Sequence, residues 1–141
     1  MGGAKGLALF AVAAALLPGC GSEPTLTASG FVDRINAEGV SIVLGRRLAS
    51  GGDAKELFAV RLPPLPGEPK PPPGSEGEPG ASGTLYVFAG AGGAEDQLRA
   101  CQAATGLICF RAQNIVVVLD EEGSSLEAQR LSVAVSRLGR Q

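Results

Sequence analysis

The chain has 141 residues, with 12 basic and 14 acidic side chains, no histidine and a formal net charge of −2. The basic residues are scattered, apart from Arg46 and Arg47, so the charge pattern offers no stripe for nucleic acid. The absence of histidine removes the usual general base of Ser-His and Cys-His pairs. With 4% aromatic residues, 21 Gly and 10 Pro, the sequence predicts a thin, aliphatic core.

The N-terminal residues have the features of a secretory leader. Lys5 supplies a positive charge, and residues 6–17 form an uncharged apolar run. A run of about a dozen residues suits a signal peptide, because a transmembrane helix needs roughly 20. The run ends in Leu17-Pro18-Gly19-Cys20, which resembles the lipobox of bacterial lipoproteins. That motif has a branched aliphatic residue three positions before the cysteine and a small residue directly before it.

This resemblance implies cleavage before Cys20 and fatty acylation of the new terminal cysteine on its thiol and its amine. Several acyl chains, such as palmitate, anchor a protein durably, since each buried CH2 contributes about 0.8 kcal/mol. The implied organisation is a signal peptide over residues 1–19 and a lipidated tether over residues 20–26, at the extracytoplasmic face of the cell membrane. Two other interpretations stay open: an ordinary secreted protein with a cysteine near its cleavage site, and an uncleaved transmembrane anchor.

Two cysteines remain once Cys20 is lipidated, and they are Cys101 and Cys109. Outside the reducing cytoplasm, an even pair is most simply a disulfide. Closing so short a loop stabilises the fold by roughly 2.5 kcal/mol in the chain-entropy model. A redox-active pair is disfavoured because the CxxC spacing is missing. A zinc site is disfavoured because two thiolates cannot fill a tetrahedral shell.

The first half of the mature chain predicts a helix followed by two strands. The helix is capped by Thr27 or Ser29 and ended by Gly39, a residue type that favours the position after a helix C-terminus. Residues 40–44 place Val40, Ile42 and Leu44 on one side of an extended chain and predict the first strand. Residues 57–62 predict the second strand, with Phe58, Val60 and Leu62 facing inward and Arg61 facing outward.

Residues 63–83 hold eight of the ten prolines, with glycine, glutamate and serine among the rest. Such a segment has little to bury, so it is expected to be disordered or polyproline II. The helix and two strands before it are too small to hold a core alone. We therefore interpret residues 27–141 as one domain that carries an insertion, which serves as a spacer or as a ligand for a partner groove.

The second half predicts the order strand, helix, strand, strand, helix. The elements are expected at residues 84–88, 94–104, 107–111, 115–119 and from about 125 to 138. The last helix has Ser124 as its N-cap and Glu127 at the capping-box position. Its apolar stripe is expected to consist of Leu126, Leu131, Ala134, Val135 and Leu138.

Residues 115–119 are the most apolar stretch of the mature chain and predict a strand buried on both faces. Asn114 is expected to supply the positive φ that a tight turn before it needs. A strand, a crossover helix and a parallel strand, with the next strand paired between the two, form a split β-α-β sheet. The prediction is an α+β two-layer sandwich, ferredoxin-like, with about five strands and three helices. The strands of the first half either extend that sheet or cover its open face.

The motifs that could carry chemistry are weak. Gly90, Gly92 and Gly93 follow a predicted strand, but the third glycine of a dinucleotide loop would fall on Glu95, whose carboxylate would repel a phosphate. Asp120-Glu121-Glu122 is interpreted as a solvated turn rather than a pair of catalytic acids. No catalytic, cofactor or metal site is predicted.

The sequence therefore favours a non-enzymatic module that binds an envelope partner. Residues 84–141, with Cys109-Phe110-Arg111-Ala112-Gln113-Asn114 before an aliphatic strand, resemble small bacterial lipoproteins for which no activity is implied. The alternative is peptidoglycan binding, because the element order of residues 84–138 is similar to that of SPOR domains. The chain departs from SPOR domains by lacking a closing strand and their glycine-phenylalanine motif, so no site residues carry over.

Overall fold

The computed structural model describes residues 24–64, 67, 80–120 and 125–140. The expected leader, Cys20, Ser124 and most of the proline-rich segment lie outside the described residues. The elements follow the order α1 (Ala28–Ala37), β1 (Val43–Leu48), β2 (Glu56–Leu62), β3 (Ala81–Val87), α2 (Ala91–Ala103), β4 (Leu107–Ala112), β5 (Ile115–Asp120) and α3 (Ser125–Leu138). These three helices and five strands confirm the predicted α+β class.

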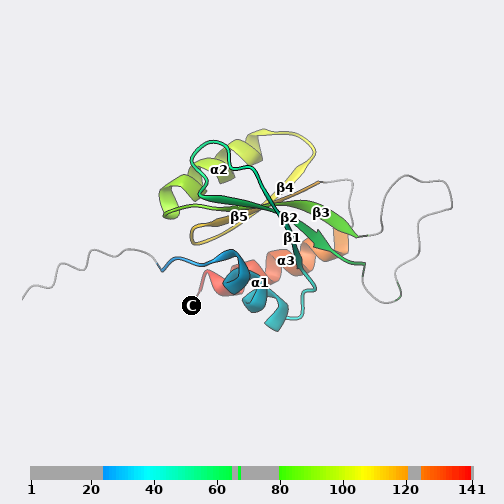
Figure 1. The fold of residues 1–141 in the computed structure, drawn as a ribbon. Helices are drawn as coiled ribbons and strands as arrows, with labels where there is room; N and C mark the ends of the chain where they lie inside the picture. Colours follow the sequence, from blue (N-terminus) through cyan, green and yellow to red (C-terminus); the bar gives the residue numbers. More distant parts are fainter. Residues whose placement is uncertain (1–23, 65–66, 68–79, 121–124, 141) are drawn as a thin grey trace, which may run out of the picture.

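The strands form one sheet in the order β1-β2-β3-β5-β4, and every neighbouring pair is antiparallel (Figure 1). The strands β3 and β4 therefore run parallel to each other with β5 between them, which confirms the split β-α-β arrangement. The strands of the first half extend the same sheet, because β2 pairs with β3.

The helices lie on both faces of the sheet: α1 and α3 cover one face, and α2 lies on the other (Figure 1). The expected two-layer sandwich thus gains a third layer where α2 packs on β4 and β5. Alternation along β5 explains why both faces are covered there. Ile115, Val117 and Leu119 enter the core beneath α1 and α3, while Val116 packs with Ala94 of α2.

The helix α1 begins and ends as its sequence predicts. Of the two candidate caps, Thr27 is the one used: its Oγ1 accepts a hydrogen bond from the Gly30 N–H at 3.0 Å. Gly39 follows the helix with φ +91°, a conformation that glycine adopts without steric cost. Phe31 and Ile35 are almost fully buried against the sheet.

The strand β1 begins three residues later than expected. Val40 and Ile42 are buried, as the alternation predicted, but they lie in the connection before the strand. The side chain of Asn36 explains the delay, since its Oδ1 accepts from the Ile42 N–H at 2.8 Å and its Nδ2 donates to the Ile42 carbonyl at 3.0 Å. Both backbone groups of Ile42 are thereby taken by a side chain instead of a neighbouring strand.

Two other boundaries differ from expectation for a common reason. The strand β3 begins at Ala81, inside the range assigned to the insertion, and α2 begins at Ala91, three residues before the expected start at residue 94. Small residues at both places were interpreted as loop-forming, but they permit close contact. A Cβ on Gly83 would lie 1.9 Å from the carbonyl oxygen of Val118, and one on Gly93 would lie 2.8 Å from Cδ1 of Phe88.

The helix α3 buries Ala128, Leu131, Ala134, Val135 and Leu138. The predicted Leu126 is wrong as a core position, because 44% of its surface is exposed. Residues 128, 131, 135 and 138 follow the spacing of one helix face, and Leu126 is turned about 200° from Ala128 at about 100° per residue.

Candidate functional site

The N-terminal entry to the fold is fastened by two residues that are far apart in sequence. The Leu26 N–H donates to Oδ1 of Asn114 at 2.6 Å, and Nδ2 of Asn114 donates back to the Leu26 carbonyl at 3.0 Å. Asn114 is 3% exposed and Leu26 is 9% exposed. Because both hydrogen bonds are buried, the chain is held firmly at this point.

The same asparagine also holds the end of β3. Its Nδ2 donates to the Phe88 carbonyl at 3.0 Å, and its backbone carbonyl accepts from the Phe88 N–H at 2.9 Å. The side chain thus joins three segments: the N-terminal entry, the end of β3, and the turn between β4 and β5. We call these three joined segments, around Leu26, Phe88 and Asn114, the tether end of the sheet.

The turn between β4 and β5 uses its two residues differently from expectation. Gln113, not Asn114, has the positive φ, at +54°. The Gln113 carbonyl accepts a hydrogen bond from Nε of Arg111 at 3.1 Å. A positive φ at the first of two turn residues is typical of a type II′ hairpin, which usually has glycine there. Asn114 is therefore important for its side chain rather than for its backbone conformation.

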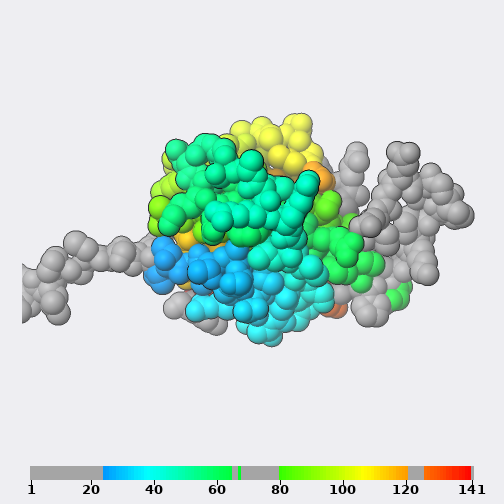
Figure 2. All heavy atoms as spheres, in the orientation of Figure 1, coloured from blue at the N-terminus to red at the C-terminus, as the bar shows by residue number. Residues whose placement is uncertain are grey.

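A recess of about 350 Å³ opens beside the Asn114 side chain, between residues 25–27 and the connection from β1 to β2. In Figure 2 the blue N-terminal part of the described chain lies next to this teal connection. Arg47, Lys55 and Glu56 contribute the charged groups of the recess. Arg47 forms an ion pair with Glu56 at 3.3 Å, whereas Lys55 has no ion-pair partner among the residues that the structure describes. The recess therefore offers one cation that the fold does not neutralise.

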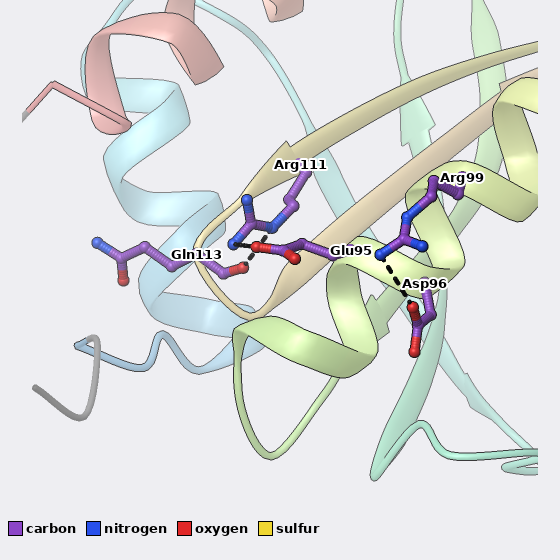
Figure 3. A network of polar contacts seen from close by, with 5 residues as sticks. All are labelled: Glu95, Asp96, Arg99, Arg111 and Gln113. Atoms are coloured by element: carbon purple, nitrogen blue, oxygen red, sulfur yellow. Dashed lines mark hydrogen bonds and ion pairs between the residues drawn. The ribbon is translucent and has the colours of Figure 1, made fainter.

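A polar network lies next to the tether end, on α2 and the end of β4 (Figure 3). Nη2 of Arg111 lies 3.5 Å from Oε1 of Glu95, and Nη2 of Arg99 lies 3.3 Å from Oδ1 of Asp96. The side chains of both carboxylates are at least half exposed, so these pairs contribute little to stability. The carboxylate of Glu95, which lies where a dinucleotide loop would have its third glycine, thus forms an ion pair with Arg111.

A second recess, of about 410 Å³, lies between the C-terminal end of α1 and α3. Nη1 of Arg137 donates to Oε2 of Glu38 at 2.7 Å across this groove. Leu126 and Val133, which are 44% and 54% exposed, form the exposed part of its apolar lining. The groove is shallow and has mixed polarity.

The cysteine pair is joined in the structure, as the sequence predicts. Cys101 in α2 and Cys109 in β4 form a disulfide with a Cα–Cα distance of 6.2 Å. Cys101 is 3% exposed, so the bond lies under the helix. It fixes α2 to the β4 edge of the sheet, which is a structural role.

The proposed lipidation site, Cys20, lies outside the described residues. None of the three described helices has the length and apolar character that a membrane span requires. Within the same residues, no group of three His, Cys, Asp or Glu side chains could hold a metal ion. The residue that sequence reasoning missed is Asn114: the signal was an amide before a fully buried strand, and it was interpreted as a turn former only.

Comparisons with known proteins give no relative for this chain: no family model, no curated protein and no solved structure matches it.

Proposed function

We propose that this protein is a lipoprotein anchored through Cys20 at the extracytoplasmic face of the cell membrane, where it binds an envelope partner without catalysing a reaction. The observation that carries the proposal is the position of the first fastened residue. Leu26 lies six residues after the cysteine of the Leu17-Pro18-Gly19-Cys20 motif. The motif is therefore followed directly by a short tether and then by a folded unit, as an anchored module requires.

The disulfide supports the extracytoplasmic location. Cleavage and lipidation would leave two cysteines, and these two are bonded to each other in the structure. Structural disulfides form and persist in oxidising compartments and are rare in the cytoplasm. The location and the cysteine inventory are thus consistent with each other.

A binding role is supported by the placement of the ionisable groups. Four acidic side chains, Glu38, Glu56, Glu95 and Asp96, form surface ion pairs with arginines. Catalytic acids and bases usually lie in clefts beside the reacting atoms, whereas these carboxylates lie at the surface and face arginines. The sequence also has no histidine to act as a general base.

The alternative function is peptidoglycan binding, and one observation favours it. The split arrangement of β3, α2, β4 and β5 has the element order that resembles SPOR domains. Helices on both faces of β4 and β5 limit the exposed part of the sheet to the opposite half. There Val43, Arg61 and Ser82 form an exposed cross-strand row on the α2 side. Glycan binding would have to use this row.

Fractionation of cells that produce the wild type or Cys20→Ala tests the anchor. We expect the wild type in the membrane fraction, labelled by a clickable palmitate analogue, and the variant in the medium or periplasm without label. Cys109→Ala, which keeps Cys20, is the matched control and should remain labelled. An unlabelled wild type, or unchanged fractionation of Cys20→Ala, would contradict the anchor.

A pull-down separates the two binding functions. The wild type and Arg61→Glu are incubated with purified peptidoglycan, and separately with solubilised envelope proteins. Sedimentation with peptidoglycan that Arg61→Glu weakens would favour the glycan alternative. Recovery of one protein in stoichiometric amount, with no sedimentation, would favour a protein partner.

A further inference from the structure

The tether between the proposed anchor and the fold is short. Six residue steps separate Cys20 from Leu26, which spans at most about 22 Å at 3.3–3.6 Å per residue. The two hydrogen bonds between Leu26 and Asn114 prevent the fold from releasing more chain into the tether.

The fastened residue lies at one end of the sheet and not at its middle. Phe88, which Asn114 holds, directly follows the last residue of β3, and Val87 pairs with Glu56 at the beginning of β2. At the other end of the same two strands, Leu62 pairs with Ala81. Six residues separate the two ends, which is about 20 Å at 3.4 Å per residue. Even fully extended, the tether is only about as long as these strands, so the two ends of the sheet cannot exchange places freely.

The tether end also has an exposed cation, Lys55, that could contact lipid headgroups. Lys55 lines the recess beside Leu26, is exposed, and has no ion-pair partner among the described residues. Its backbone N–H donates to the Val87 carbonyl at 2.8 Å, so the position of the lysine at this end is fixed. A cation held near a bilayer is attracted to the phosphates of anionic lipids.

We infer that the tether end of the sheet faces the bilayer and that Lys55 contacts headgroup phosphates, while the Leu62–Ala81 end faces away from the membrane. This inference rests on the proposed lipidation of Cys20. In this orientation the recess beside Asn114 lies against the membrane surface. The orientation also leaves the row of Val43, Arg61 and Ser82, near the Leu62–Ala81 end, accessible to an envelope partner.

The test measures which end lies near lipid. The full-length lipoprotein is purified in its lipidated form and reconstituted in vesicles of phosphatidylethanolamine and phosphatidylglycerol that carry a headgroup-attached quencher. A fluorophore is placed by Ala89→Cys, in the recess, or by Ser82→Cys, at the distant end; both side chains are exposed. Cys101 and Cys109 do not react because they are bonded to each other.

We expect the label at position 89 to be quenched several-fold more strongly than the label at position 82. Adding Lys55→Glu to Ala89→Cys should reduce quenching at position 89. Insertion of about 20 Gly/Ser residues between Pro24 and Thr25 should reduce the difference between the two labels by at least half, because a longer flexible tether permits tumbling.

Equal quenching at both positions in protein that floats with the vesicles would overturn the orientation and leave the anchor intact. Stronger quenching at position 82 would overturn it as well. Quenching at position 89 that is unchanged by Lys55→Glu would overturn the phosphate contact. Protein that does not float with the vesicles would overturn the proposed anchor, and this inference with it.

Discussion

Asn114 and Leu26 are 88 residues apart in sequence, yet one side-chain amide binds both backbone groups of the other residue. The side chain of Asn114 works here as a short substitute for a neighbouring strand: it accepts from one N–H and donates to two carbonyls, those of Leu26 and Phe88. The point at which the chain enters the fold therefore depends on a single buried residue.

Replacing Asn114 with alanine should lower the free energy of unfolding by about 3 kcal/mol. The substitution leaves one buried N–H and two buried carbonyls without this partner, and each unsatisfied group costs about 1–3 kcal/mol. Urea unfolding followed by circular dichroism measures the loss as a lower midpoint at constant slope.

The matched control is Asn36→Ala. Asn36 makes the same pair of hydrogen bonds with Ile42, but these are only partly buried and Asn36 itself is exposed, so water can replace part of them. We expect a loss of about 1 kcal/mol there. Equal losses for the two variants would contradict a special role for the buried asparagine.

Glycine at position 113 should stabilise the protein by about 0.5–1 kcal/mol. Gln113 has a φ of +54°, which costs a residue with a Cβ about 1–2 kcal/mol. Glycine avoids this cost, but it also raises the conformational entropy of the unfolded chain, which offsets part of the stabilisation. The Oε1 of Gln113 is also buried without a hydrogen-bond partner in the described part of the chain, so losing the side chain removes a further cost. A higher urea midpoint for Gln113→Gly is the expected result.

The same substitution one residue later serves as the control. Asn114→Gly should destabilise the protein, since the buried amide is lost. If Gln113→Gly and Asn114→Gly both lower the urea midpoint, or both raise it, the different roles assigned to these two turn residues are wrong.

The fold class was predictable because it depends on patterns that local physics sets. Residues 115–119 are apolar throughout, and the structure buries that strand on both faces. The capping residue Thr27 and the terminating residue Gly39 also work as their residue types predict. In each of these cases the nearest few residues decide the structure.

The differences arise where distant segments decide. Ala81, Ser82 and Gly83 have little strand preference of their own, and they form a strand because β2 and β5 lie on both sides. The roles of Gln113 and Asn114 could not be assigned from the turn alone, because the partner of Asn114 is Leu26. The candidate site was missed for the same reason: it exists only when residues 26, 55, 88 and 114 are brought together.

The disulfide should contribute about 2.5 kcal/mol to stability in the chain-entropy model. Cys101 and Cys109 enclose a short loop, and the bond attaches α2 to an edge strand. A double variant, Cys101→Ala with Cys109→Ala, should unfold at a lower urea concentration than the wild type. Dithiothreitol should lower the wild-type midpoint toward that of the double variant and leave the double variant unchanged.

Mass spectrometry of a non-reducing digest provides the direct check. A peptide that contains both Cys101 and Cys109 in bonded form is expected from the native protein. Two free thiols in the native protein would contradict both the bond and the proposed extracytoplasmic location.

Two glycines in the second half should respond to alanine with opposite signs. A Cβ at Gly83 would lie 1.9 Å from the Val118 carbonyl oxygen, on β5, so Gly83→Ala must displace a strand in the interior of the sheet. We expect a loss of about 3 kcal/mol or more, at the upper end of the range for overpacked cores. Gly92 lies exposed in α2, and a Cβ there would have no heavy atom within 4 Å, so Gly92→Ala should stabilise the helix by about 0.5–1 kcal/mol. A higher urea midpoint for Gly83→Ala would contradict the close approach of β3 and β5, and a lower one for Gly92→Ala would contradict the open space at that position of α2.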